Sequence, residues 1–189
     1  VRHLVRSRGL GDGYKGQLRN ERAPVRTGHA TTTLITAGDA RILVDPGLPA
    51  PAIAARLEER SGLSPDQITH VFMSRFHPEC RRGIEAFANA QWLLSERERE
   101  GVGVPIVEGL KRLGETAEAA RDAGEELHED QRSMIEVLQR DVAILQRTQA
   151  APDSLAPGVD LFPLAGGTPG LTGLLVLRPS GHVLVCAAA

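Results

Sequence analysis

Thr69-His70-Val71-Phe72-Met73-Ser74 is a largely apolar run, and a polar stretch, residues 75–83, follows it directly. An apolar run of this length with a β-branched and an aromatic residue predicts a strand that is buried on both faces. Buried strands of this kind belong to parallel sheets, and the loops at their carboxyl ends are the usual seat of functional sites. The sequence around residues 69–83 therefore predicts an α/β fold with its site in the loop 75–83.

The flanking segments support parallel pairing. Residues 31–45 predict a β-hairpin that turns at Gly38-Asp39, because β-branched residues lie on both sides of that turn. Residues 52–60 predict a short helix, residues 84–88 a helical turn, and residues 90–94 another strand. Two successive passages from strand to helix to strand favour parallel strands with helices covering the sheet.

A long helical region interrupts this pattern. Ser95-Glu96-Arg97-Glu98 matches a capping box, and apolar residues then recur at helical spacing as far as about Gln149. We predict a helical hairpin over residues 104–149, with a break near Gly124 and with its apolar stripe buried against something outside the helix pair. Three final strands are expected at residues 159–162, 174–177 and 183–186.

Composition narrows the function classes. The 189 residues carry a formal net charge of −2 and six aromatic side chains, which argues against a general nucleic-acid binder. The longest apolar stretch, residues 171–177, is far shorter than the roughly 20 residues of a membrane span. Two cysteines give no disulfide framework and suit a reducing, cytoplasmic compartment, and we expect no secretory signal in this sequence.

Charge is unevenly distributed along the chain. Residues 1–27 hold seven basic and two acidic side chains, a balance of +5. Residues 96–147 hold 13 acidic and eight basic side chains, a balance of −5. Such blocks are either solvated surface or two halves of a complementary contact, within one chain or between two.

Three ligand-capable residues lie in the loop 75–83. His77, Glu79 and Cys80 all have side chains that bind zinc, although their spacing alone is a weak signal. Cys80 is also a candidate thiol nucleophile with His77 as its base, or else a buried residue that fills space. The loop further contains a candidate anion-binding cluster, formed by Arg75, Arg81 and Arg82.

The segments as a set resemble the metallo-β-lactamase fold superfamily of metal-dependent hydrolases. The hairpin of residues 31–49 ends in Asp45-Pro46-Gly47, as the opening hairpin of that family does. Residues 68–72 lead into its His-x-His-x-Asp-His metal loop, and residues 155–162 lead to its Gly-His-Thr-Pro-Gly loop. The resemblance implies an αβ/βα sandwich and chemistry that depends on a metal-activated water.

The departures from that pattern fall on the metal ligands. Arg75 stands at the first His of the metal loop, His77 is kept, and Glu79 and Cys80 replace the Asp and the last His. Gly167 stands at the ligand His of the later loop, and Ala188 at the bridging Asp. The resemblance places the family's final His and the rest of its second half beyond this sequence.

We therefore expect one metallo-β-lactamase-like α/β sandwich domain over residues 1–189, with a helical insertion at 96–150 and an incomplete second half. The missing ligands favour a catalytically inactive binding or assembly protein without a cofactor. The alternative is a zinc- or iron-dependent hydrolase with a site of His77, Glu79 and Cys80, completed by residues outside this chain. The featureless ending, residues 186–189, leaves that alternative open. We expect a homo-oligomer, most simply a dimer through the helical insertion, and no nucleic-acid or membrane partner.

Overall fold

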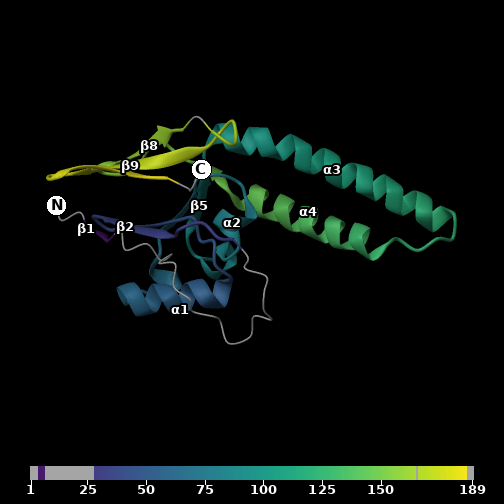
Figure 1. Ribbon diagram of the computed structural model, residues 1–189, viewed down its shortest axis with the longest axis horizontal. Coiled ribbons are helices and arrows are strands. Elements are labelled where there is room, and N and C mark those ends of the chain that lie inside the picture. The colour runs from purple at the N-terminus through teal and green to yellow at the C-terminus, as the bar shows by residue number, and fades with distance from the viewer. Residues whose placement is uncertain (1–3, 7–27, 165, 187–189) are drawn as a thin grey trace.

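Two β-sheets face each other in the computed structural model, which describes residues 4–6, 28–164 and 166–186 (Figure 1). The first sheet has the strand order β1-β2-β3-β4-β5-β6 and the second the order β10-β9-β8-β7. The strands of the first sheet are β1 Leu4–Arg6, β2 Thr33–Ala37, β3 Ala40–Val44, β4 His70–Met73, β5 Gln91–Leu94 and β6 Gln149–Ala150. Those of the second are β7 Ser154–Ala156, β8 Val159–Pro163, β9 Thr172–Arg178 and β10 Gly181–Val185.

The predicted hairpin and the parallel centre of the first sheet are both confirmed. Strands β2 and β3 pair antiparallel around Gly38, whose φ of 58° is a conformation that glycine adopts without strain. Strands β3, β4 and β5 then pair in parallel, with Val71 beside Leu43 and Trp92. The sequence did not reveal β1, β6 and β7, because runs of two or three residues are too short to show a period.

Helices cover the outer face of the first sheet. Helix α1 (Ala50–Ser61) buries Ile53 and Leu57 and ends at Gly62, whose φ is 70°. A 3₁₀ turn, η1 (Pro65–Gln67), follows, with Ser64 as its N-cap and Gln67 completing a capping box. Part of the stretch 75–83, predicted as a loop, is in fact the short helix α2 (Pro78–Arg81), and the 3₁₀ turn η2 (Ile84–Ala86) follows it.

An apolar cluster fills the space between the two sheets. Strands β2, β3 and β4 contribute Ile35, Val44 and Phe72, and the second sheet contributes Val159 and Val176. All five side chains are essentially inaccessible to solvent. Burial on this scale, at roughly 1.5–3 kcal/mol for each large side chain, holds the two sheets together.

The predicted helical region forms a hairpin of α3 (Glu96–Asp122) and α4 (Glu129–Arg147), which extends away from the sheets (Figure 1). Gly124 breaks it in the left-handed conformation, with φ 73°. Within the single chain the sandwich covers only part of the predicted apolar stripe, and cover of the rest by a second copy stays a prediction. Leu145 packs on the apolar cluster that includes Ile53 and Leu57 of α1, and Leu138 lies next to Gly109 of α3, whereas Met134 is 51% exposed. None of the described helices is long and apolar enough to cross a membrane.

Candidate functional site

The carboxyl ends of β3 and β4 bring Asp45 and Ser74 together, because these strands are parallel neighbours. Asp45 Oδ1 accepts a hydrogen bond from the Ser74 backbone N–H at 2.8 Å, and Oδ2 accepts one from the Ser74 hydroxyl at 2.7 Å. The Thr32 hydroxyl donates to the Asp45 carbonyl at 2.7 Å. Burial raises the pKa of Asp45 to about 6, although both hydrogen bonds from Ser74 oppose the rise.

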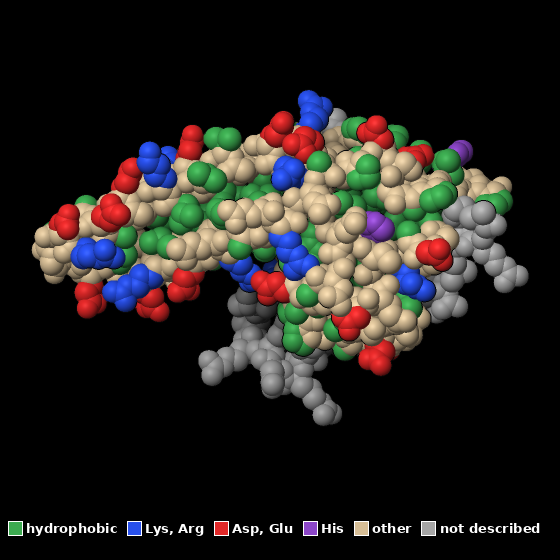
Figure 2. Space-filling view, turned by 180° about the vertical axis from the view of Figure 1, so that it is seen from behind, with side chains coloured by type: hydrophobic (Ala, Val, Ile, Leu, Met, Phe, Trp, Pro, Cys, Tyr) green, Lys and Arg blue, Asp and Glu red, His purple; other side chains and the backbone are tan. Residues whose placement is uncertain are grey.

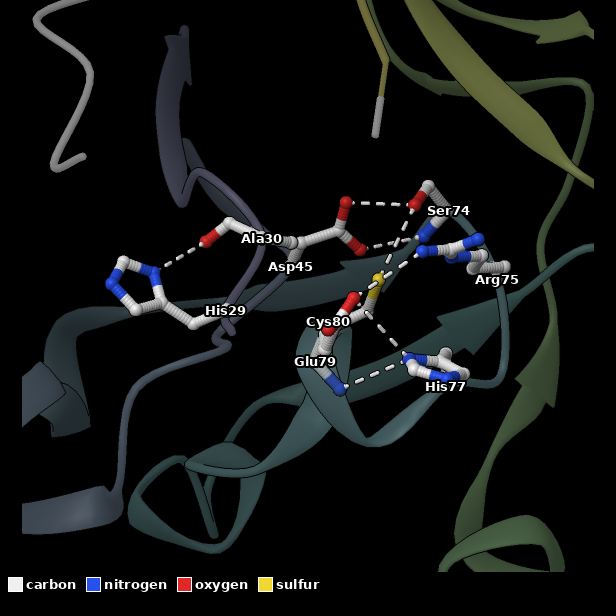
Figure 3. Close-up of polar contacts among 8 residues, drawn as sticks. All are labelled: His29, Ala30, Asp45, Ser74, Arg75, His77, Glu79 and Cys80. Atoms are coloured by element: carbon white, nitrogen blue, oxygen red, sulfur yellow. Dashed lines mark hydrogen bonds and ion pairs between the residues drawn. The ribbon is translucent and has the colours of Figure 1, made fainter. Parts of the chain in front are cut away.

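Cys80 faces the same interior. Its Sγ lies 3.9 Å from the Ser74 hydroxyl, and its side chain is fully buried (Figure 3). Burial, and then the negative charge of Asp45, raise the pKa of the Cys80 thiol to about 11. A thiol with so high a pKa is protonated at neutral pH and is a poor nucleophile.

The side chains of His77 and Glu79, in the same segment, face outward. Glu79 Oε2 lies 3.5 Å from Arg75 Nη2 and 3.6 Å from His77 Nδ1, so this carboxylate lies between two cationic or potentially cationic groups (Figure 3). His77 Nδ1 also accepts a long hydrogen bond, 3.4 Å, from the Glu79 backbone N–H at the start of α2. The side chains of His77 and Glu79 are 50% and 38% exposed, whereas that of Arg75 is 22% exposed.

Two glycines border this outward-facing group. A Cβ atom at Gly167 would lie 3.8 Å from Arg75 Nη1, and one at Gly28 would lie only 2.6 Å from Glu79 Oε1. The Arg75 guanidinium therefore faces the position of the later loop where the family resemblance places a ligand His. Ala188, the other substituted ligand position, lies outside the described residues.

The three arginines of the candidate anion cluster do not converge. Arg75 contacts Glu79, whereas Arg81 Nη2 lies 2.5 Å from Asp141 Oδ1 of α4 and its guanidinium stacks 4.2 Å from the Phe76 ring centroid. Burial lowers the pKa of Arg81, and the charge of Asp141 opposes that change. Arg82 is partly buried and forms no ion pair within the described part of the chain.

The sequence did not indicate the role of Glu98, which like Asp45 is a carboxylate only 1% exposed. The sequence pattern assigns Glu98 to a capping box, and the Ser95 hydroxyl does accept a hydrogen bond from the Glu98 backbone N–H. The Glu98 side chain instead accepts the backbone N–H groups of Phe76 at 2.9 Å and Gly170 at 3.2 Å. It thereby links the segment after β4 to the loop before β9, a long-range contact for which the sequence holds no signal.

These residues do not fit a divalent metal. A zinc site needs three or four converging donors at about 2.0–2.3 Å from the ion. His77 and Glu79 face outward, whereas Cys80 faces the interior towards Ser74. Across residues 4–6, 28–164 and 166–186, no group of three His, Cys, Asp or Glu side chains is placed to hold a metal ion.

A family model described as the metallo-beta-lactamase superfamily matches residues 25–187. The fold is similar to AidC, a dizinc quorum-quenching lactonase, with 20% identity and a TM-score of 0.60 over 82% of this chain and 54% of that one. It is also similar to a metallo-beta-lactamase-like protein of Thermotoga maritima, with 17% identity and a TM-score of 0.59 over 86% and 69% of the two chains. No curated protein matches the chain significantly. The chain thus spans little more than half the length of AidC.

Proposed function

The chain belongs to the metallo-beta-lactamase superfamily, and we propose that it is a non-catalytic member that keeps the sandwich as a scaffold for binding or assembly. The observation that carries this proposal is the ion pair between Arg75 and Glu79. It occupies two of the positions at which the family resemblance places metal ligands.

Electrostatics support the proposal. A guanidinium carries a permanent positive charge, so it repels a divalent cation at close range. Arg75 lies in the midst of the residues that would have to bind the metal, with Glu79 on one side and Gly167 on the other. Hydrolysis in this superfamily depends on a metal that activates water, and the described residues offer no substitute nucleophile.

Cys80 is a poor candidate for that substitute. A thiol nucleophile needs a base within hydrogen-bond reach and a lowered pKa. The pKa of Cys80 is raised instead, and its Sγ lies next to the Ser74 hydroxyl rather than His77. The two cysteines are free, which fits the reducing environment of the cytoplasm, and we propose that location for the protein.

The second candidate function is hydrolysis with zinc or iron held by His77 and Glu79, with the remaining ligands supplied from outside this chain. The observation in its favour is that His77 Nδ1 and Glu79 Oε2 lie 3.6 Å apart on an accessible surface. On this alternative Cys80 would have to turn outward from its buried position. The substrate class would follow from relatives such as the lactonase AidC.

Hydrolysis assays separate the two candidates. The purified chain would be incubated with lactone, thioester and phosphodiester substrates, with and without added zinc or iron. The non-catalytic proposal predicts no turnover above buffer in any mixture. Turnover that chelator abolishes and that His77→Ala removes, while the exposed-histidine control His182→Ala keeps it, would establish the metal-dependent alternative. Turnover that survives chelator but is lost in Cys80→Ala would instead indicate thiol chemistry.

A further inference from the structure

The guanidinium group of Arg75 has more hydrogen-bond donors than its surroundings satisfy. Its Nε atom is buried and has no hydrogen-bond partner in the described part of the chain. Its Nη2 atom lies 3.5 Å from Glu79 Oε2, which is longer than the about 2.7–2.9 Å of a charge-assisted hydrogen bond (Figure 3). The thiol of Cys80, another neighbour of this guanidinium, is only a weak acceptor. A partly buried cation with unused donors favours an additional acceptor.

An open position adjoins the same guanidinium. A Cβ atom at Gly167 would lie 3.8 Å from Arg75 Nη1 and, its chain neighbours aside, would meet no other atom of the described residues within 4 Å. Gly167 is exposed, and the side chain of Arg75 is 22% exposed, so small solutes can reach this position from the solvent. The position therefore has room for a small group next to a positively charged donor.

We propose that this position binds the carboxylate group of a small acidic ligand, with Arg75 Nη1 as its hydrogen-bond donor. A planar guanidinium matches the geometry of a carboxylate, and Nη2 stays available to Glu79. Because Glu79 already places one negative charge beside Arg75, a monoanionic carboxylate is favoured over a dianionic phosphate. This inference rests on the proposed function, since it requires that Arg75, rather than a metal ion, is the cation at this place.

The rest of the surface favours no general attraction of anions. The chain has a formal net charge of −2, and acidic side chains lie among the basic ones on the face that Figure 2 shows. Arg56 of α1 provides a comparison, because its Nη1 donates to Glu59 Oε2 at 2.9 Å and its charge is paired at hydrogen-bond distance. Binding of a carboxylate should therefore depend on Arg75 and not on Arg56.

NMR titration of the full chain with sodium acetate tests the site. Protein freed of metal would be titrated at constant ionic strength, with acetate replacing chloride. We expect the backbone N–H signals of Gly166 and Gly167 to shift and to saturate. The dissociation constant should be on the order of 10 mM, because one guanidinium contact gives only weak affinity.

Three substitutions at the site should change this dissociation constant in different directions. Arg75→Gln should weaken acetate binding at least ~5-fold, and Glu79→Gln should tighten it about threefold, because it removes a competing negative charge. Gly167→Ala should weaken binding without changing any charge, because its methyl group fills part of the open position. Arg56→Gln and Glu59→Gln change the matched ion pair of α1 and should leave the dissociation constant unchanged.

The outcomes separate this inference from the proposed function. Signals that do not respond to acetate, or a response that Arg75→Gln leaves unchanged, would overturn the inference while the non-catalytic proposal stands. Acetate binding that appears only after zinc is added would overturn both, because a metal would then be the cation of the site. If Arg75→Gln does not fold, Glu79→Gln still decides, since acetate binding that it fails to tighten would contradict the inference.

Discussion

The two sides of the segment after β4 differ in burial and in the contacts that they make. On the inner side, Ser74 and Cys80 are fully buried beside Asp45 and bonded within the core. On the outer side, the side chains of His77 and Glu79 are accessible and contact one another, and Glu79 also contacts Arg75. Positions that together would bind a metal are thus divided between core packing and a surface ion pair.

Under the proposed non-catalytic function, the sandwich keeps its stability without a metal. The hydrogen bonds between Asp45 and Ser74 join the ends of β3 and β4 and need no metal. The side chains of His77 and Glu79 are exposed and contribute little to the core. Substitutions on the buried side should therefore have large effects, and those on the exposed side small ones.

Thiol reactivity should show the largest contrast. Cys80 is buried with a pKa raised to about 11, whereas Cys186 is exposed. At pH 8 the thiolate fraction of Cys80 is at least ~100-fold below that of an ordinary cysteine, and burial slows its reaction further. The folded native protein should react with one equivalent of iodoacetamide, and the folded Cys186→Ser variant should react with none. Rapid labelling of Cys80 in folded protein would show that this side is open.

Glu98→Ala should destabilise the fold by roughly 2–4 kcal/mol, because it leaves two buried N–H groups, those of Phe76 and Gly170, without an acceptor. The free energy of unfolding in urea measures this effect. Glu96→Ala, an exposed acidic residue in the same first turn, is the matched control and should cost within about 0.5 kcal/mol. Equal losses in the two variants would mean that Glu98 acts only on the helix end.

Asp45→Asn should change the pH dependence of stability. The pKa of Asp45 is raised to about 6, so the folded protein holds this proton more tightly than the unfolded chain does. Stability therefore falls as pH rises from about 4 to about 6, by roughly 2–3 kcal/mol from this group. Asparagine cannot ionise, and it can donate to the Ser74 hydroxyl while accepting from the Ser74 N–H.

Urea unfolding at pH 4.5 and 7.5 measures this effect. Relative to the native chain, Asp45→Asn should gain stability at the higher pH. A difference between the two proteins that is independent of pH would mean that Asp45 ionises as freely as in the unfolded chain.

Glu79→Gln should produce the smallest effect, under about 1 kcal/mol, because its ion pair with Arg75 is partly exposed and long. The unfolding midpoint in urea, recorded at low and at high salt, is the appropriate measurement. A loss of unfolding free energy as large as that expected for Glu98→Ala would mean that Glu79 stabilises the fold as the buried residues do. The contrast between the buried and the exposed side would then not hold.

Much of the sandwich follows from local sequence signals. The hairpin around Gly38, the parallel strand 69–74 and the break at Gly124 each have a period or a turn residue that identifies them. The short strands β6 and β7 carry no such signal, since neighbouring strands define them more than their own residues do. The short helix α2 could not be predicted because its four residues have the composition of a polar loop.

The candidate site was predictable in position but not in arrangement. The sequence indicated the segment that holds Arg75, His77 and Cys80, but no spacing rule says which side chains face the core. That Cys80 turns towards Asp45 depends on the packing of β3 against β4. The two loops that Glu98 bridges lie 22 and 72 residues away from it, so only the folded chain reveals the contact.

Zinc binding to the native chain tests the central claim most directly. Protein purified without chelator would be analysed for metal content and then titrated with zinc in a calorimeter, beside His77→Ala and His182→Ala. The account predicts well under one equivalent of bound metal and the same weak titration for all three proteins, because Arg75 holds Glu79 and Cys80 faces the core. One tightly bound equivalent that His77→Ala abolishes and His182→Ala retains would contradict it.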